Sequence, residues 1–227
     1  MNQPSFKKTN DFPEHLVIIP NEHLVIVENG REATGIRHTH IRVGRDSSLI
    51  CVLLLPTTGE LQRSITLELD AGARAELFGF IAGAGQGKLT LSLTELHTKG
   101  ASWARTTVCG LLHDASSLHL QGLIAVHPSA HGSDGLFEAR AMLLSDAARA
   151  TIIPNLEIQA RDVRATHRCA IGPLDLEQLF YLQTRGCTLS DARKLLVDGF
   201  VEQHLGRLSD ASLRGSISRE YHSLFSL

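Results

Sequence analysis

The sequence predicts a mainly β protein, in which a stacked solenoid of β-strands is followed by a small C-terminal α-helical domain. From His15 to Ala170, short apolar or alternating segments follow one another, and no long helical pattern interrupts them. A turn-like unit recurs between these segments, as is typical of repeat architectures. After Gly172-Pro173 the apolar spacing becomes helical. We therefore predict a flexible segment over residues 1–14, a solenoid core over 15–172 and a helical domain over 173–227.

The composition is that of an ordinary globular chain. Its 227 residues carry a net charge of −2, which argues against a general nucleic-acid binder, because such proteins show a basic excess or stripe. The first residues are polar, unlike a signal peptide, and no apolar run reaches the roughly 20 residues that span a bilayer. A cytoplasmic protein is therefore expected. Four cysteines without a CxxC pair then favour reduced thiols over disulfides: Cys51, Cys109, Cys169 and Cys187.

The predicted strands rest on period-2 alternation and on apolar runs of strand length. Lys88–Thr98 alternates strictly, with Leu89, Leu91 and Leu93 on one face and hydroxyl side chains on the other. LICVLLLP is a continuous apolar run, and EHLVIIP and EHLVIVENG are apolar runs closed by turns. Between such segments stand units rich in Gly, Asp, Ala and Ser, which favour the turn conformations that redirect a chain. These units are Val43–Ile50, Leu69–Leu77, Leu112–Leu120 and Leu144–Ile152.

The C-terminal region is typical of capped helices. Asp175 and Gln178 predict a capping box, and Gly186 is expected to end this helix as its C′ residue. Thr188 predicts the start of a second helix, and Arg219–Leu227 favours one more short helix. The apolar stripe of the second helix consists of Ala192, Leu195, Leu196, Gly199 and Phe200.

Several residue groups are candidates for chemistry, and each has a structural alternative. His38 and His40 face one way on a strand and could ligate a metal, although two surface histidines give the same pattern. Asp134 and Glu138 could be the paired carboxylates of a sugar-cleaving site, but such sites also use aromatic side chains, and these are few. Gly83–Gly87 is not followed by the GKS or GKT of a phosphate-binding loop, and no helix begins there, so it is expected to be a tight hairpin loop. Four histidines are interpreted as loop and turn residues: His113, His119, His127 and His131.

His167 and Cys169 form another candidate. They stand two apart on a predicted strand, so their side chains face the same way. Imidazole and thiolate both ligate soft metals and iron–sulfur units. On spacing alone, a purely structural pair is the more frequent explanation of this pattern.

Leu143–Leu205 carries an ordered series of motifs. SDAARA precedes PNLEI and a segment with the pattern DV.A.H, and GPLDLEQLFYLQTRG and TLSDARKLLVDGF follow. In order and spacing these blocks resemble the carboxy-terminal signature of the SufB/SufD proteins of iron–sulfur cluster assembly. The resemblance implies a right-handed parallel β-helix (β-solenoid) followed by a small C-terminal α-helical domain.

The resemblance also implies a scaffold subunit and not an enzyme. Such proteins pair along their β-helices and bind an ABC-type ATPase, SufC, through the helical region. The chain would pair with a SufB-like subunit, or with itself as a homodimer, through the β-helix edge. An iron–sulfur cluster at that interface would be transient, with none tightly bound in the isolated chain. The resemblance is to a short form without the family's N-terminal helical domain, and no nucleic acid or membrane partner is expected.

Residue by residue, the resemblance is to SufD. His167 falls on the histidine that acts in cluster assembly in SufD, whereas Arg168 and Ala139 stand where SufB has an important glutamate and its essential cysteine. Cys169 has no counterpart in the family pattern and would add a thiolate only if exposed and of lowered pKa. No metal site is expected elsewhere. The candidate contacts to the ATPase lie in Leu176–Phe200 and are Tyr181, Arg185 and Phe200.

Two other hypotheses stay open beside the scaffold. The first is a β-helix enzyme that processes polysaccharide, which would need an acidic cleft lined by aromatic side chains. The second is a structural interaction module without metal chemistry, in which His167 is a buried, hydrogen-bonded residue.

Overall fold

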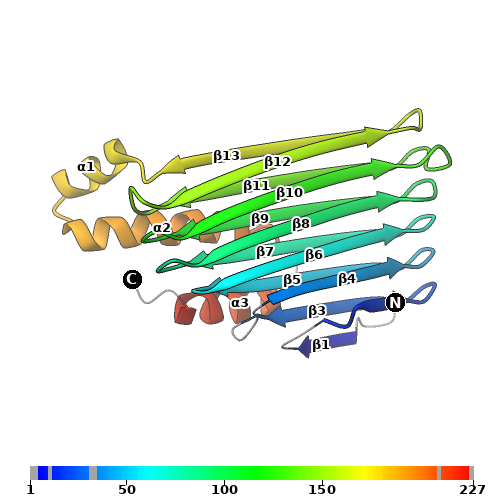
Figure 1. Cartoon of the computed structure of the whole chain (residues 1–227), viewed down its shortest axis with the longest axis horizontal. Helices are drawn as coiled ribbons and strands as arrows, with labels where there is room; N and C mark the ends of the chain where they lie inside the picture. Colours follow the sequence, from blue (N-terminus) through cyan, green and yellow to red (C-terminus); the bar gives the residue numbers. More distant parts are fainter. Residues whose placement is uncertain (1–4, 10–11, 31–34, 209–210, 225–227) are drawn as a thin grey trace.

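The computed structural model describes residues 5–9, 12–30, 35–208 and 211–224, which form a β-solenoid followed by three helices (Figure 1). The chain alternates between two parallel sheets, so that odd-numbered strands lie in one sheet and even-numbered strands in the other. The predicted mainly β solenoid with C-terminal helices is therefore confirmed. Among the described residues, no helix is long and apolar enough to cross a membrane.

The two sheets are built from strands of similar length that stack in register. The seven-stranded sheet contains β1 (Ser5–Thr9), β3 (His23–Asn29), β5 (Ser48–Thr57), β7 (Arg74–Gly83), β9 (Trp103–Leu112), β11 (Asp134–Leu143) and β13 (Arg164–Pro173). The six-stranded sheet contains β2 (His15–Ile18), β4 (Gly35–Val43), β6 (Glu60–Leu69), β8 (Lys88–His97), β10 (Ser117–Val126) and β12 (Arg149–Ile158). Because each strand pairs only with strands of the coils before and after it, β12 and β13 each have one unpaired edge in the described chain.

Residues with positive φ make the corners of the solenoid. Asp46 and Asp114 adopt φ values of 53°, and Gly72 adopts 67°, within three of the predicted turn units. The turn at Gly83–Gly87 also closes with a backbone hydrogen bond, from the Gly87 N–H to the Ala84 carbonyl at 3.0 Å. It is not the expected hairpin, however, because β7 and β8 belong to different sheets. The chain turns a corner there instead of folding back on itself.

The core lies between the two sheets and follows the predicted alternation. Leu89, Leu91 and Leu93 point inward and are buried, each stabilising the fold by roughly 1.5–3 kcal/mol relative to exposure. Large and small residues complement each other across the core. A Cβ on Gly122 would lie 2.4 Å from the Phe137 ring, so Phe137 fills the space that Gly122 leaves open.

The helices are α1 (Leu176–Thr184), α2 (Leu189–Leu205) and α3 (Ala211–Leu224). The Asp175 carboxylate accepts from the N–H groups of Glu177 and Gln178, which fixes the start of α1 as predicted. Gly186, with φ of 92°, follows the end of α1, and Thr188 caps α2 by accepting from the Asp191 N–H.

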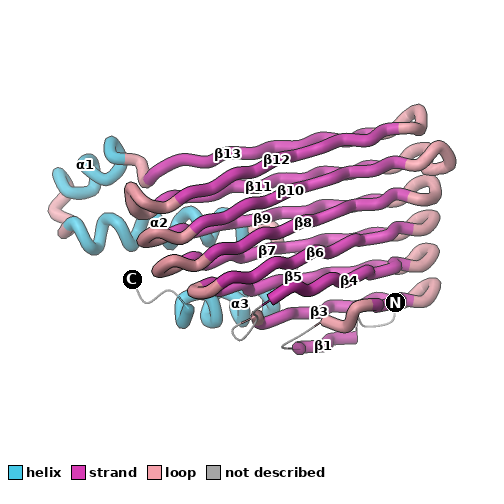
Figure 2. The backbone as a smooth tube through the Cα atoms, in the orientation of Figure 1, coloured by secondary structure: helices cyan, strands magenta, loops and turns pink. Residues whose placement is uncertain are grey.

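The helices cover part of the outer face of the seven-stranded sheet (Figures 1 and 2). Val197 and Val201 of α2 and Leu213 of α3 share one buried cluster with outward residues of β3, β5, β7 and β9. Those sheet residues are Val25, Val27, Val52, Leu54, Phe78, Phe80, Cys109 and Leu111. The outward face of this sheet is therefore apolar where the helices pack.

Two segments differ from the sequence-based expectation. Residues 1–14 were expected to be flexible, but Ser5–Thr9 form β1, which pairs in parallel with β3. The last helix was expected at Arg219–Leu227, but α3 begins earlier, at Ala211, and residues 225–227 lie outside the described part. Both differences arise from pairing or packing with distant residues, which local pattern does not report.

Candidate functional site

The last coil, formed by β12 and β13, leaves the end of the solenoid open. His167 and Cys169 are exposed on β13 and stand in register with Phe137 and Ala139 of β11, whose side chains are buried in the core. Side chains in register share a sheet face, so both candidate residues face the side that is core in the coil below. The structure thus places the predicted pair together at the open end of the solenoid.

The surroundings of the pair at the open end are apolar. Leu156 and Ile158 of β12 follow the core residues Ile124 and Val126 in register, yet both are exposed because no further coil covers them. Ile171 of β13 is likewise exposed. The open end therefore combines an apolar surface with two unpaired strand edges, a combination that favours pairing with another β-strand.

Cys169 meets only one of the two conditions for a reactive thiolate. The residue is exposed, but the part of its side chain that is shielded from water raises the pKa of the thiol. A backbone hydrogen bond with Ala139 lowers this pKa, and the nearby Glu138 carboxylate raises it, so that the pKa stays above its ordinary value. A raised pKa keeps the thiol protonated near neutral pH. In the isolated chain, Cys169 is therefore a weaker ligand candidate than the sequence suggested.

Glu138 is a buried carboxylate surrounded by arginines. It is 1% exposed on β11, and its carboxylate lies 2.6 Å from the Arg207 guanidinium, 3.5 Å from that of Arg140 and 4.0 Å from that of Arg168. Burial alone would raise its pKa, but the bond to Arg207 and the charges of all three arginines hold the pKa below its ordinary value. Glu138 thus links two parts of the molecule. It binds Arg207, which follows α2, and it lies near Arg168 on the edge strand β13.

The carboxylate pair considered for sugar cleavage has other partners. Asp134 is bound by the Arg105 guanidinium at 2.9 Å, and Glu138 is bound by Arg207. Each carboxylate is thus committed to a guanidinium and is not placed with the other as a free acid and base.

The remaining histidine candidates do not form a metal centre. The Glu68 carboxylate accepts a hydrogen bond from Nε2 of His40 at 2.8 Å, and His38 is exposed beside it on β4. His113 is bonded to its neighbour Asp114 at 2.7 Å. Within the described ranges, no three His, Cys, Asp or Glu side chains gather in a geometry that could hold a metal ion. All four cysteines are free thiols, and Cys51 and Cys109 are buried.

The candidate contacts on the helices differ in exposure. Tyr181 is exposed on α1, and the Arg185 guanidinium lies 5.2 Å from the centre of its ring. Phe200 is half-buried and packs against the buried cluster under α2, and its ring centre lies 4.8 Å from that of His204, with the two planes tilted by 59°. Tyr181 and Arg185 are thus exposed, Phe200 is exposed only in part, and all three stay predicted contacts.

Sequence reasoning did not single out an apolar surface on α1 and α2. Large apolar side chains are exposed there: Leu176, Phe180, Leu189 and Leu195. A groove of about 770 Å³ opens beside it, lined by leucines of both helices and by Arg193 and Lys194. The sequence predicts helices in this region, but it does not show which apolar residues of a helix a neighbouring element covers.

The β-solenoid and its C-terminal helices agree with the fold that the resemblance implied. Residues 21–200 match the family model described as SUF system FeS cluster assembly, SufBD core domain. The chain therefore belongs to the SufBD family, and its curated relatives make it SufD-like.

The relatives support this assignment over different lengths. An iron–sulfur cluster assembly SufBD family protein of Mycobacterium tuberculosis is 34% identical over 185 residues, covering 77% of this chain and 46% of the relative. SufD of Escherichia coli is 31% identical over 53% of this chain and 29% of its own length. SufD of Bacillus subtilis is 28% identical over 70% of this chain and 36% of its own length. The chain spans less than half the length of these relatives.

Proposed function

We propose that the chain is a non-enzymatic, SufD-like scaffold subunit that assembles iron–sulfur clusters in the cytoplasm. The observation that carries this proposal is the open last coil, where two unpaired edges and an apolar end surround His167. In this proposal a SufB-like subunit pairs with β12 and β13 and covers Leu156, Ile158 and Ile171. Burial of such side chains and added strand hydrogen bonds are the usual sources of affinity in β-strand addition.

His167 would then face the interface with the partner. A neutral imidazole can ligate iron, and the exposed position of His167 leaves it accessible to a nascent cluster. Most of the thiolate ligands would come from the partner, because the pKa of Cys169 is raised in this chain. The cluster would be transient and held between the subunits.

The second surface would bind a SufC-like ABC ATPase. Phe180 and Tyr181 are exposed side by side on α1, and Leu195 is exposed on α2. Aromatic side chains of this kind are frequent anchors in protein interfaces. Because Glu138 joins the chain after α2 to β13, a movement of the ATPase would reach the pairing edge through Arg207 and Arg168.

Co-expression with SufB-like and SufC-like proteins of the same organism tests the proposal. We expect a ternary complex in size-exclusion chromatography. Replacing Leu156 by Asp should remove the SufB-like subunit alone, and replacing Phe180 by Ala should weaken retention of the ATPase alone. Ile36→Asp is the control, since Ile36 is also an exposed apolar residue and lies on β4, outside both surfaces.

His167→Ala addresses the chemistry separately. We expect the complex to form normally but to yield less iron–sulfur cluster on reconstitution, as judged by visible absorption. If no complex forms with either partner, the chain is an interaction module of another kind. Unchanged cluster yield in His167→Ala would leave the scaffold role intact and remove His167 from the site.

A further inference from the structure

The outer side of the edge strand β13 carries positive charge. Arg164 and Arg168 are exposed on β13 and stand in register with Asp134 and Glu138 of β11. Because Phe137 points into the core, its neighbour Glu138 and the residues that share its face lie on the outer side of the sheet. Figure 1 shows β13 as the last strand of the described chain at this end. The outer side of the pairing edge therefore ends in two cations.

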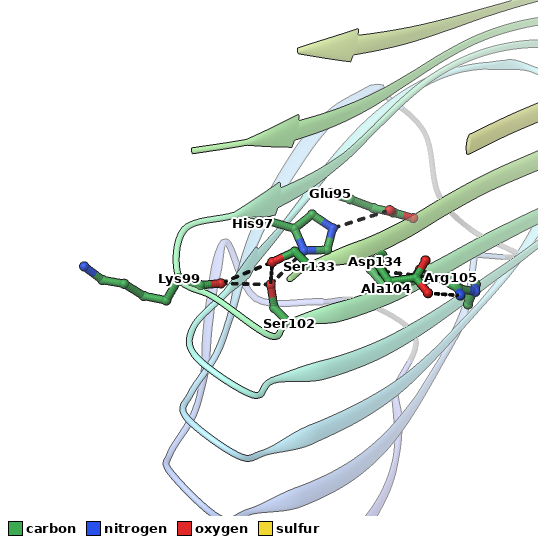
Figure 3. A network of polar contacts seen from close by, with 8 residues as sticks. All are labelled: Glu95, His97, Lys99, Ser102, Ala104, Arg105, Ser133 and Asp134. Carbon is green, nitrogen blue, oxygen red and sulfur yellow. Dashed lines mark hydrogen bonds and ion pairs between the residues drawn. The ribbon is translucent and has the colours of Figure 1, made fainter. Parts of the chain in front are cut away.

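The carboxylates on the neighbouring strand do not neutralise these arginines. Asp134 is bound at 2.9 Å by Arg105 of β9, the strand on the far side from β13 (Figure 3). Glu138 binds Arg207 at 2.6 Å, and Arg168 is the most distant of its three guanidinium groups, at 4.0 Å. The Arg168 side chain is 66% exposed, so its guanidinium can accept a further carboxylate as partner.

The apolar end of the solenoid fixes how a partner strand must face. Leu156, Ile158 and Ile171 point toward the open end and are exposed. A partner covers them only if its own apolar side chains point the same way, since a slip by one residue turns a strand's side chains to the other face. The outward side chains of the partner strand then lie beside Arg164 and Arg168, with about 4.5–5.5 Å between the Cβ atoms of opposite residues.

A second copy of this chain fits β13 poorly. The outward residues of β13 include no acidic side chain: they are Arg164, Thr166, Arg168, Ala170 and Gly172. Pairing of β13 with its own copy would gather the arginines of both copies on one face of the joint sheet, where like charges are destabilising. β12 does not change this balance, because its outward face carries one cation and one anion, Arg149 and Glu157.

The two arginines do not block the edge itself. One way in which proteins prevent pairing at a bare edge is to point a charged side chain inward, into the contact. The inward residues of β12 and β13 include no Lys, Arg, Asp or Glu. The contact thus stays open to an apolar partner, and only the outer side restricts the charge of the strand that can pair.

We propose that β13 selects its partner by charge, and that the partner strand presents carboxylates to Arg164 and Arg168. This inference rests on the proposed function, because it concerns the same pairing edge, and it adds the chemistry of the partner. The partner is a different subunit with an acidic outer edge and not a second copy of this chain. Complementary charges favour one partner and exclude those that bring like charges together.

Titration calorimetry of the full chain with the SufB-like subunit of the same organism tests the role of Arg168. At low salt, Arg168→Glu should weaken binding by about tenfold or more, and Arg168→Gln by a smaller factor. The loss should shrink at high salt, because ions screen exposed charges. Arg45→Glu is the matched control, since Arg45 is exposed at the corner between β4 and β5, and it should leave the affinity unchanged. Circular dichroism checks the fold of each variant.

A second experiment needs no SufB-like subunit. In analytical ultracentrifugation at low salt, wild type mixed with the double variant Arg164→Glu, Arg168→Glu should associate more strongly than either protein alone. Each arginine then meets a carboxylate across the paired edges. The proposal is overturned if Arg168→Glu and Arg168→Gln bind the SufB-like subunit as tightly as wild type, or if the mixture associates no more strongly than wild type alone. If wild type forms no complex with the SufB-like subunit, the proposed function fails, and the mixture still decides whether charge controls the edge.

Discussion

Glu138 is the residue at which the chain after α2 and the open edge of the solenoid meet. Its one carboxylate faces three guanidinium groups, of which that of Arg207 is closest, at 2.6 Å. Arg207 is partly exposed, so solvent screens part of this interaction. The pair nevertheless ties two parts of the molecule that are far apart in the sequence.

Glu138→Gln should destabilise the fold by about 1–2 kcal/mol at pH 7, because it removes the charge that Arg207 binds. The pKa of Glu138 is lowered in the folded state, so its stabilisation is present above the ordinary carboxyl pKa and is lost as the pH falls through the folded value. Urea unfolding at pH 7 and pH 3 measures this. The difference between wild type and variant should shrink at pH 3. Glu157→Gln, an exposed residue of β12, should change stability little at either pH.

Cys169 should react slowly with iodoacetamide for an exposed cysteine. Burial and the Glu138 carboxylate raise its pKa, so its alkylation rate should rise with pH along a curve centred above that of a free cysteine, whose pKa is about 8.5. Mass spectrometry of the Cys169 peptide follows the reaction. Glu138→Gln should move the curve to lower pH. A midpoint below that of free cysteine would contradict the raised pKa.

The roles of single residues could be predicted only in part from the sequence. His167 and Cys169 were predicted to face one way, and the register of β13 against β11 agrees. The alternation of Leu89, Leu91 and Leu93 also continues with Glu95 and His97, which are buried in the core as well. The arginines around Glu138 could not be found in this way, because Arg207 is distant along the chain and only the packing of the helices brings it near.

At the scale of elements, the coils depend on matched volumes across the core. Gly122 of β10 and Phe137 of β11 form such a match, with a virtual Cβ on Gly122 at 2.4 Å from the ring. The glycine is needed there for close approach and not for its backbone conformation.

Gly122→Ala should therefore destabilise the protein by about 1–3 kcal/mol through overpacking, measured as a lowered thermal midpoint. Adding Phe137→Leu should recover part of the loss, because the smaller side chain makes room for the new methyl group. Gly199→Ala is the matched control, since Gly199 is exposed on α2 with no atom near a new Cβ, and it should raise stability by about 0.5–1 kcal/mol. Equal effects of the two alanines would contradict the packing argument.

Elements were predictable where their signal is local. Period-2 alternation and the caps at Asp175 and Thr188 are short-range patterns, and the structure agrees with them. β1 was not predicted, because the Ser5–Thr9 strand is defined by pairing with β3 and its own sequence is polar. The sequence also predicts a hairpin at Gly83–Gly87 where the structure has a corner, because the turn residues do not show which sheet the next strand joins.

At the scale of the whole molecule, the helices and the solenoid share one buried cluster. Val201 of α2 is fully buried in this cluster, together with Phe78 and Phe80 of β7. The solenoid and its helices should thus unfold together, although stacked coils can in principle separate stepwise.

Val201→Ala should lower the thermal midpoint and cost about 1–3 kcal/mol. Far-ultraviolet circular dichroism reports the helices and strands, while fluorescence of Trp103, the single tryptophan, reports β9. The two curves should coincide in wild type and shift by the same amount in the variant. Separate transitions would show that the helices melt independently.

The family and the architecture were accessible from the sequence because repeated coils and ordered motifs extend over most of the chain. The matched region, residues 21–200, covers the coils from β3 to β13 and the first two helices to Phe200. The sequence could not predict which surfaces stay exposed, because exposure depends on the complete three-dimensional packing.

The shared cluster also has a consequence for synthesis on the ribosome. Val25 and Val27 are synthesised well before Leu213 and Ile217, although all four lie in the same buried cluster. During translation, the apolar outer face of the growing sheet is therefore exposed to water until the helices that cover it have been synthesised. The nascent coils are most vulnerable to aggregation, and most in need of a chaperone, in the interval before the C-terminal helices leave the ribosome.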